Sequence, residues 1–295
     1  DLEPQRSPAG RPGAHKAHAA GTVGQPPNAF PNALRVPFVV EDSDSYCNLG
    51  INNLSDSPAT VKIFLLSRQG SSLGARTTRV PPHGMVQINR VVSYLQDVPT
   101  ESPEGHLILE SDQDSRAWAS LIDRQSLDSN VMLASDETAS RILIPSSVAS
   151  ERYTSGLVVV NTSAVASSLK ITIRNAQGST LGALNKVSIA AQGPIYFKNI
   201  FQAAGIAPGG NAYGPIEIES SNGAQMQAVL LIRTRERTGG FLPGVNLNQG
   251  ARSLLLPYVA DSADVRTNLG LNTPGVATAI VSVSLATARC SCSLG

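Results

Sequence analysis

Apolar and polar residues alternate in many short segments of this chain. The clearest segment contains Leu169, Ile171 and Ile173, each separated from the next by one polar or charged residue. This period of two is typical of a β-strand with one buried face. The chain also contains 25 Gly and 19 Pro, which favour reversals between strands. The pattern therefore predicts many short strands and few helices.

The alternating segments recur along the chain. The stretches "RVPFVV", "LIPSSV" and "LLPYVA" place Pro37, Pro145 and Pro257 at intervals of 108 and 112 residues. The turn "GSSLG" from Gly70 returns as "GSTLG" from Gly178. The apolar positions of the next predicted strand correspond between copies: Leu49 and Ile51, Leu157 and Val159, Leu269 and Leu271. Such self-similarity indicates tandem structural units, with two copies followed by the first part of a third.

Each of the first two copies contains six or seven predicted strands in about 110 residues, the size of an antiparallel immunoglobulin-like β-sandwich. A short segment of each, "NRVVSYLQDV" or "KNIFQAAGI", fits a helical turn that crosses between sheets. We therefore expect an all-β protein of tandem antiparallel immunoglobulin-like β-sandwiches with an incomplete third copy. The expected divisions are an extended low-complexity tail (1–33), repeat 1 (34–141), repeat 2 (142–251) and the first three strands of repeat 3 (252–295).

With these motifs, the chain resembles the tandem immunoglobulin-like sandwich repeats of secreted bacterial surface proteins. The resemblance rests on Val36-Pro37, on the Asn-Leu-x-Leu/Ile-x-Asn strand from Asn48, and on the Gly-x-x-Leu-Gly hairpin from Gly70. It implies an extracellular structural, adhesive or assembly role and brings no catalytic residues. The start at Asp1 is also consistent with a processed, exported chain.

The three predicted strands of repeat 3 would present an apolar face and unpaired edges. Three explanations fit: an incomplete sequence, completion by another chain, or packing against repeat 2. In the second case, a donor strand from one chain would extend a sheet of the next, and head-to-tail contacts would build a fibre. The expected donor residues are Val23, Phe30 and Leu34, and the expected acceptor residues are Leu255, Leu256, Val259, Leu269, Leu271, Val281 and Val283.

The three cysteines, Cys47, Cys290 and Cys292, allow two interpretations. They are either ordinary thiols or, if neighbouring chains pair, an intermolecular disulfide that joins Cys47 to Cys290 or Cys292. Alternation along a strand would place Cys290 and Cys292 on the same side.

Charge and motifs exclude several functional classes. The net charge of +1 provides no general attraction for nucleic acid, and no apolar run is long enough to span a membrane. The chain lacks a Gly-x-Ser-x-Gly nucleophile elbow and a Cys-His-carboxylate arrangement. We therefore expect no enzymatic activity, no catalytic residue and no cofactor.

Acidic loops and a single Trp support an alternative function. Carboxylates in loops can hold calcium, although none here has the EF-hand spacing and solvated turn residues are the default interpretation. The calcium candidates are Asp42, Asp44, Asp112, Asp114, Asp261 and Asp264. Trp118, aligned with Ala228 in repeat 2, is expected in the core and is otherwise a platform for a sugar.

Two functions follow from these patterns. The first is an extracellular structural or assembly protein, a fibre subunit that self-associates through sheet edges into a homopolymer. The alternative is a cell-surface adhesin or glycan-binding module that uses the sandwich loops to contact a surface glycan or protein.

Overall fold

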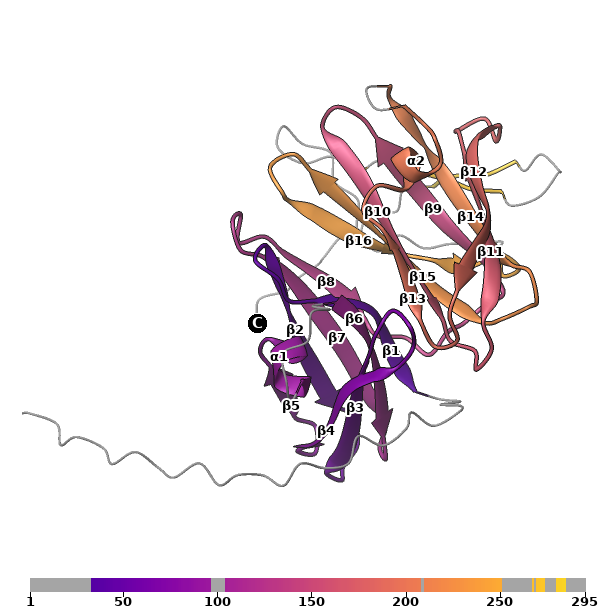
Figure 1. Cartoon of the computed structure of the whole chain (residues 1–295). Coiled ribbons are helices and arrows are strands. Elements are labelled where there is room, and N and C mark those ends of the chain that lie inside the picture. Colours follow the sequence, from indigo (N-terminus) through magenta and orange to yellow (C-terminus); the bar gives the residue numbers. More distant parts are fainter. Residues whose placement is uncertain are drawn as a thin grey trace, which may run out of the picture.

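A computed structural model describes residues 33–96, 104–207, 210–250, 267, 269–273 and 280–284, and the structural statements below concern these residues. Two β-sandwiches lie side by side (Figure 1). Unit 1 comprises β1 to β8 and unit 2 comprises β9 to β17. Every strand pairing is antiparallel. The all-β antiparallel sandwich fold predicted from the alternation is confirmed.

Unit 1 has eight strands and one short helix. They are β1 (Leu34–Val40), β2 (Ser45–Asn53), β3 (Ala59–Leu66), β4 (Ser72–Val80), β5 (Met85–Ile88), α1 (Val91–Leu95), β6 (Glu104–Ser111), β7 (Ser115–Asp123) and β8 (Ser129–Leu133). One sheet has the order β1-β6-β3-β4 and the other β5-β2-β7-β8.

Unit 2 repeats this plan and adds one two-residue strand. Its elements are β9 (Arg141–Ala149), β10 (Tyr153–Asn161), β11 (Ser167–Arg174), β12 (Thr180–Ile189), β13 (Pro194–Phe197), α2 (Ile200–Ala203), β14 (Ala212–Ser220), β15 (Met226–Thr234), β16 (Gly239–Pro243) and β17 (Val245–Asn246). The sheet orders are β17-β9-β14-β11-β12 and β13-β10-β15-β16. Strand for strand, β9 to β16 therefore match β1 to β8.

The recurring turns have the backbone that the glycines permit. Gly70 and Gly178 both have positive φ values, 75° and 82°, which only glycine adopts at little cost. The helical turns predicted between the sheets are also present as α1 and α2. Asn199 caps α2, because its side chain accepts hydrogen bonds from the main-chain nitrogens of Phe201 and Gln202.

The residues that alternate along the strands form the cores of the units. Leu49 and Ile51 are fully buried in unit 1, and their counterparts Leu157 and Val159 are fully buried in unit 2. Burial of the apolar face of each sheet supplies most of the driving force for this packing. The predicted inward positions are thus confirmed.

The two units share part of one apolar core. The side chains of Val158, Val160, Val229 and Leu231 leave unit 2 on the outer face of the β10-β15 sheet and join the core cluster of unit 1. The Phe38 and Tyr196 rings add to this contact, with their centroids 5.1 Å apart. Because both faces of this sheet are buried, the sandwiches are packed against each other rather than joined only by the linker between β8 and β9.

A polar cluster holds the other end of the contact between the units. Arg237, in the turn between β15 and β16, donates from Nε to Asp123 Oδ2 at 2.7 Å and from Nη1 to Gln125 Oε1 at 3.2 Å. Burial alone would raise the pKa of Asp123, but hydrogen bonds from Ser126, Arg237 and Gln125 outweigh it and hold the pKa below its usual value. Asp123 therefore stays ionised as the centre of this cluster.

Candidate functional site

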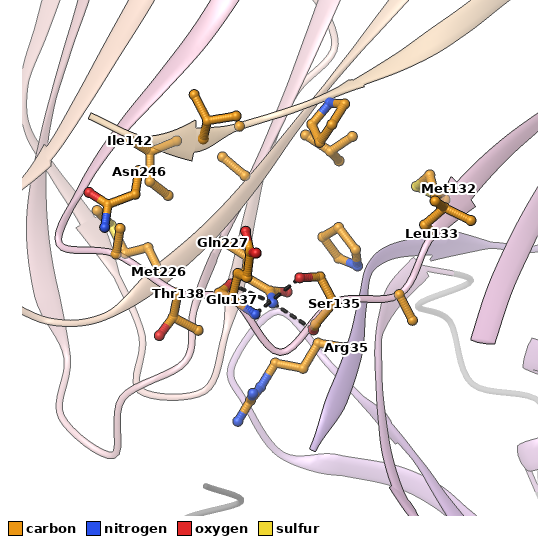
Figure 2. Close-up of a pocket in the computed structure, with 18 of the residues that line it drawn as sticks. Arg35, Met132, Leu133, Ser135, Glu137, Thr138, Ile142, Met226, Gln227 and Asn246 are labelled. Carbon is orange, nitrogen blue, oxygen red and sulfur yellow. Dashed lines mark hydrogen bonds between the residues drawn. The ribbon is translucent and has the colours of Figure 1, made fainter. Parts of the chain in front are cut away.

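A cleft lies between the two units, beside the linker that follows β8 (Figure 2). Its volume is about 760 Å³, within the range of about 300–1,000 Å³ that is usual for ligand sites. Figure 2 shows Met132 and Leu133 on one wall and Ile142, Met226 and Asn246 on the opposite wall. The walls therefore come from different sandwiches and are mainly apolar.

Gln227 provides a fixed polar group at the floor of the cleft (Figure 2). Its Nε2 donates to the main-chain oxygens of Ser135 at 2.8 Å and Glu137 at 2.9 Å, which orients the amide. The side chain is buried, with 7% of the residue exposed, and its Oε1 has no hydrogen-bond partner among the described residues. A buried acceptor without a partner costs about 1–3 kcal/mol, and this oxygen is itself shielded from solvent, so the amide is held by its two donor contacts.

The sequence pattern does not predict this cleft, because its walls come from positions in both units. One signal was available. In the pairing with β2 and β10, Gln227 occupies the position of the exposed Arg116 of unit 1. A neutral amide in place of a charged residue, beside the apolar run Leu157 to Val160, indicates that this face of unit 2 is covered.

The described carboxylates proposed for calcium contact main-chain nitrogens or arginines, and that of Asp44 lies 3.6 Å from Arg237 Nη2. Asp42 Oδ1 accepts hydrogen bonds from the nitrogens of Asp44 and Ser45 at 2.8 and 2.7 Å. Asp112 Oδ1 accepts from the Thr60 nitrogen at 2.7 Å, and Asp114 pairs with a neighbouring arginine at 3.2 Å. The described part of the chain contains no group of three or more His, Cys, Asp or Glu side chains that could hold a metal ion. Asp261 and Asp264 lie outside the described residues.

Cys47 lies in the core of unit 1 with none of its surface exposed, and it is a free thiol. Burial raises its pKa to about 12, so the thiolate that forms disulfides is scarce. A disulfide from Cys47 to another chain would therefore require unit 1 to open. Cys290 and Cys292, its predicted partners, lie outside the described residues.

Trp118 is not a core residue, contrary to the expectation. It is half-buried on the outer face of β7 and covers Gly50, its partner on β2. A Cβ atom on this glycine would lie 2.2 Å from Trp118 Cε2, so the ring fits only because residue 50 lacks a side chain.

The strand pairing also shifts the alignment of β7 with β15 by one residue. Gly50 pairs with Trp118 and its counterpart Val158 pairs with Val229, so Val229 and not Ala228 corresponds to the Trp.

The predicted assembly residues lie partly in the described regions. Leu34 belongs to β1, where its main chain pairs with Leu109, so this donor residue is part of unit 1. Leu269, Leu271, Val281 and Val283 are 46%, 49%, 49% and 67% exposed, and none belongs to an assigned strand. The Asn272 side chain donates to the main-chain oxygen of Pro145 in β9 at 2.8 Å. Val23, Phe30, Leu255, Leu256 and Val259 lie outside the described residues.

His106, which had no predicted role, is completely buried. It lies on β6 with 1% of its surface exposed. Burial, together with the nearby Arg35 guanidinium, lowers its pKa to about 3. The imidazole is therefore neutral at physiological pH and acts as part of the packed interior.

Comparison with known proteins provides no family assignment. No protein-family model matches the chain, and no curated protein matches it. Solved structures that match include the apo form of Pleurotus ostreatus lectin, at 12% sequence identity over 74% of this chain and 78% of the lectin chain. The TM-score of 0.20 is too low for the lectin to inform the function of this chain. The described helices are also too short to cross a membrane. By fold and site, the described part of the chain is a pair of β-sandwiches with a cleft at their junction.

Proposed function

We propose that the protein is a non-catalytic structural protein that acts outside the cell and self-associates through segment 267–284. One observation supports this function most strongly. At the spacing of 112 residues that relates Pro145 to Pro257, Leu157 and Val159 correspond to Leu269 and Leu271. The first pair is fully buried, whereas the second pair is about half exposed.

The next predicted strand of repeat 3 shows the same contrast. At that spacing Leu169 and Ile171 correspond to Val281 and Val283. The unit 2 residues are 1% and 0% exposed, and the valines are 49% and 67% exposed. At Leu269, Leu271, Val281 and Val283, this segment therefore has the apolar pattern of sandwich strands without the burial that the corresponding residues obtain in unit 2. Exposed apolar surface of this kind favours association with a partner.

A second copy of the chain is the partner that we propose. The net charge of +1 produces little repulsion between copies. Sheet edges are available for pairing, because each sheet of both units is open rather than closed into a barrel. The extracellular location rests on the resemblance to secreted surface repeats and belongs to the same proposal.

Sedimentation velocity over a range of concentrations tests the proposal. We expect the unmodified chain to associate as its concentration rises, and Leu271→Asp to remain monomeric because its charge opposes burial. Leu54→Asp is the matched control, since Leu54 and Leu271 are both 49% exposed. A chain that is monomeric at all concentrations, or association that Leu54→Asp and Leu271→Asp reduce equally, would overturn the proposal.

A further inference from the structure

Two edge strands from different units face each other at the cleft. β8 ends one sheet of unit 1 and β16 ends one sheet of unit 2, and each has five residues. They are linked near their first residues, where the Gly239 nitrogen donates to Asp128 Oδ2 at 2.9 Å. At their other ends, Leu133 and Pro243 both line the cleft. The space between these strands therefore widens into the cleft.

The main-chain groups along β8 are arranged to accept another strand. The Ala134 nitrogen donates to the Ala117 oxygen at 2.9 Å, so residues 130, 132 and 134 direct their main-chain groups toward β7. Residues 131 and 133 then direct theirs to the open edge. The Val131 and Leu133 side chains are 53% and 77% exposed, and no described strand pairs with these two residues on this edge. The next outward position, Ser135, pairs with Arg35 of β1, which limits the open edge to β8 itself.

β16 presents a similar edge from the other side. The Gly244 nitrogen donates to the Ala228 oxygen at 2.9 Å, which fixes the alternation and turns the main-chain groups of Phe241 outward. Pro243, the next outward position, has no N–H group to donate. β16 therefore offers fewer donors than β8, and β8 is the better edge for strand addition.

We propose that an extended segment of a second copy, residues 280–284, adds to β8 in this cleft. The inference rests on the proposed function, because it names where the self-associating segment binds. Ile280, Val281 and Val283 are 97%, 49% and 67% exposed, and no strand is assigned to residues 280–284. These five residues would extend for about 17 Å, the length of a five-residue edge strand.

The chemistry of segment 280–284 fits the cleft. It contains no charged residue, and Val281 and Val283 alternate with Ser282 and Ser284, so the valine face can contact the apolar walls. Its main-chain N–H groups supply donors for the outward main-chain oxygens of Val131 and Leu133 on β8. The contact joins two different surfaces and is therefore heterologous, so repeated copies would form a chain.

Fluorescence anisotropy tests the inference with a labelled synthetic peptide of residues 279–285, Ala-Ile-Val-Ser-Val-Ser-Leu. The receiving protein is the full chain carrying Val281→Asp and Val283→Asp, which prevents its own segment from competing. We expect saturable binding. A peptide with N-methyl groups on alternate residues keeps the side chains but loses donors, and we expect it to bind about tenfold more weakly or worse.

Substitutions in the receiving chain locate the site. Val131→Lys with Leu133→Lys should weaken peptide binding about tenfold or more, because charges on an edge strand oppose strand addition. Both side chains are largely exposed, and thermal melting confirms that the variant folds. Val165→Lys is the matched control, since Val165 is 59% exposed and lies outside the cleft lining. Absence of binding, or equal binding by the N-methylated peptide or by the β8 variant, would overturn the inference.

The same variants separate this inference from the proposed function. If the unmodified chain self-associates but the β8 variant associates equally well, the cleft is not the docking site and the proposed function stands. If the unmodified chain is monomeric but the peptide binds and the β8 variant does not, self-association is refuted and the cleft remains a strand-accepting site.

Discussion

Acidification should destabilise the protein through His106 before it affects the carboxylates. The pKa of His106 is about 3 in the folded chain, compared with an ordinary value of 6.5. Between these values the unfolded chain binds a proton that the folded chain excludes, so stability is complete above pH 6.5 and falls as the pH falls. Each pH unit in this range costs about 1.4 kcal/mol, so the loss between pH 7.5 and pH 5 is about 2 kcal/mol.

Urea unfolding at several pH values, compared between the unmodified chain and His106→Gln, measures this loss. The substitution changes stability at every pH, but it removes the steep dependence between pH 6.5 and pH 5. Asp123 and Glu41, whose folded pKa values are lowered, contribute stability that is lost nearer pH 4, below this window. His83→Gln is the control, because its imidazole is exposed and contacts Asp56 at 2.7 Å.

Two results would refute this reasoning. One is an equal pH dependence in the unmodified chain and in His106→Gln. The other is an imidazole NMR signal from His106 that titrates near pH 6.5 in the folded protein. Either result would show that the ring is hydrated or that it gains a proton without unfolding.

Three further predictions test other parts of the fold. Gly50→Ala should destabilise unit 1 by about 1–3 kcal/mol in chemical denaturation, because its Cβ would clash with the Trp118 ring. In the double variant, Trp118→Ala should reduce the cost of Gly50→Ala, since the ring that causes the clash is gone. Additive losses in the double variant would contradict this explanation. Asn161→Ala should cost about 1–3 kcal/mol in the same assay, because Asn161 Nδ2 donates to the oxygens of Val165 and Ala190 and its Oδ1 accepts from Ser163. Asn175→Ala is its control and should cost less, since Asn175 is less buried and accepts only within its own turn, and equal losses would refute the distinction. In the variant Cys290→Ser/Cys292→Ser, Cys47 should react with a thiol reagent only after denaturation, and rapid reaction in the native protein would show that the thiol is accessible.

Much of the fold could be predicted because one face of each strand is buried. Alternation in Leu169, Ile171 and Ile173 directly reflects this burial. The strand register was less predictable, since a shift of one residue still leaves apolar residues in "QAVLLIRT" on either face. Because of this ambiguity the sequence pattern matches Trp118 with Ala228, whereas the strand pairing matches it with Val229.

The cleft could not be predicted in the same way, because it depends on how the units pack. The relevant signal is an absence of alternation. Leu157 to Val160 are all apolar, so both faces of β10 are buried, one in unit 2 and one against unit 1. A continuous apolar run indicates a second covered face but does not identify what covers it.

The differences between the copies therefore carry more functional information than their similarities. Inward residues such as Ile51 and Val159 are buried in both units because each sandwich needs a core. On the outer face, Gly50 becomes Val158 and Trp118 becomes Val229, and this change gives unit 2 the apolar surface that docks against unit 1. Docking brings the edge of β8 opposite β16 and leaves the cleft at their diverging ends. Outer-face substitutions in a duplicated sandwich thus create a site that neither unit contains alone.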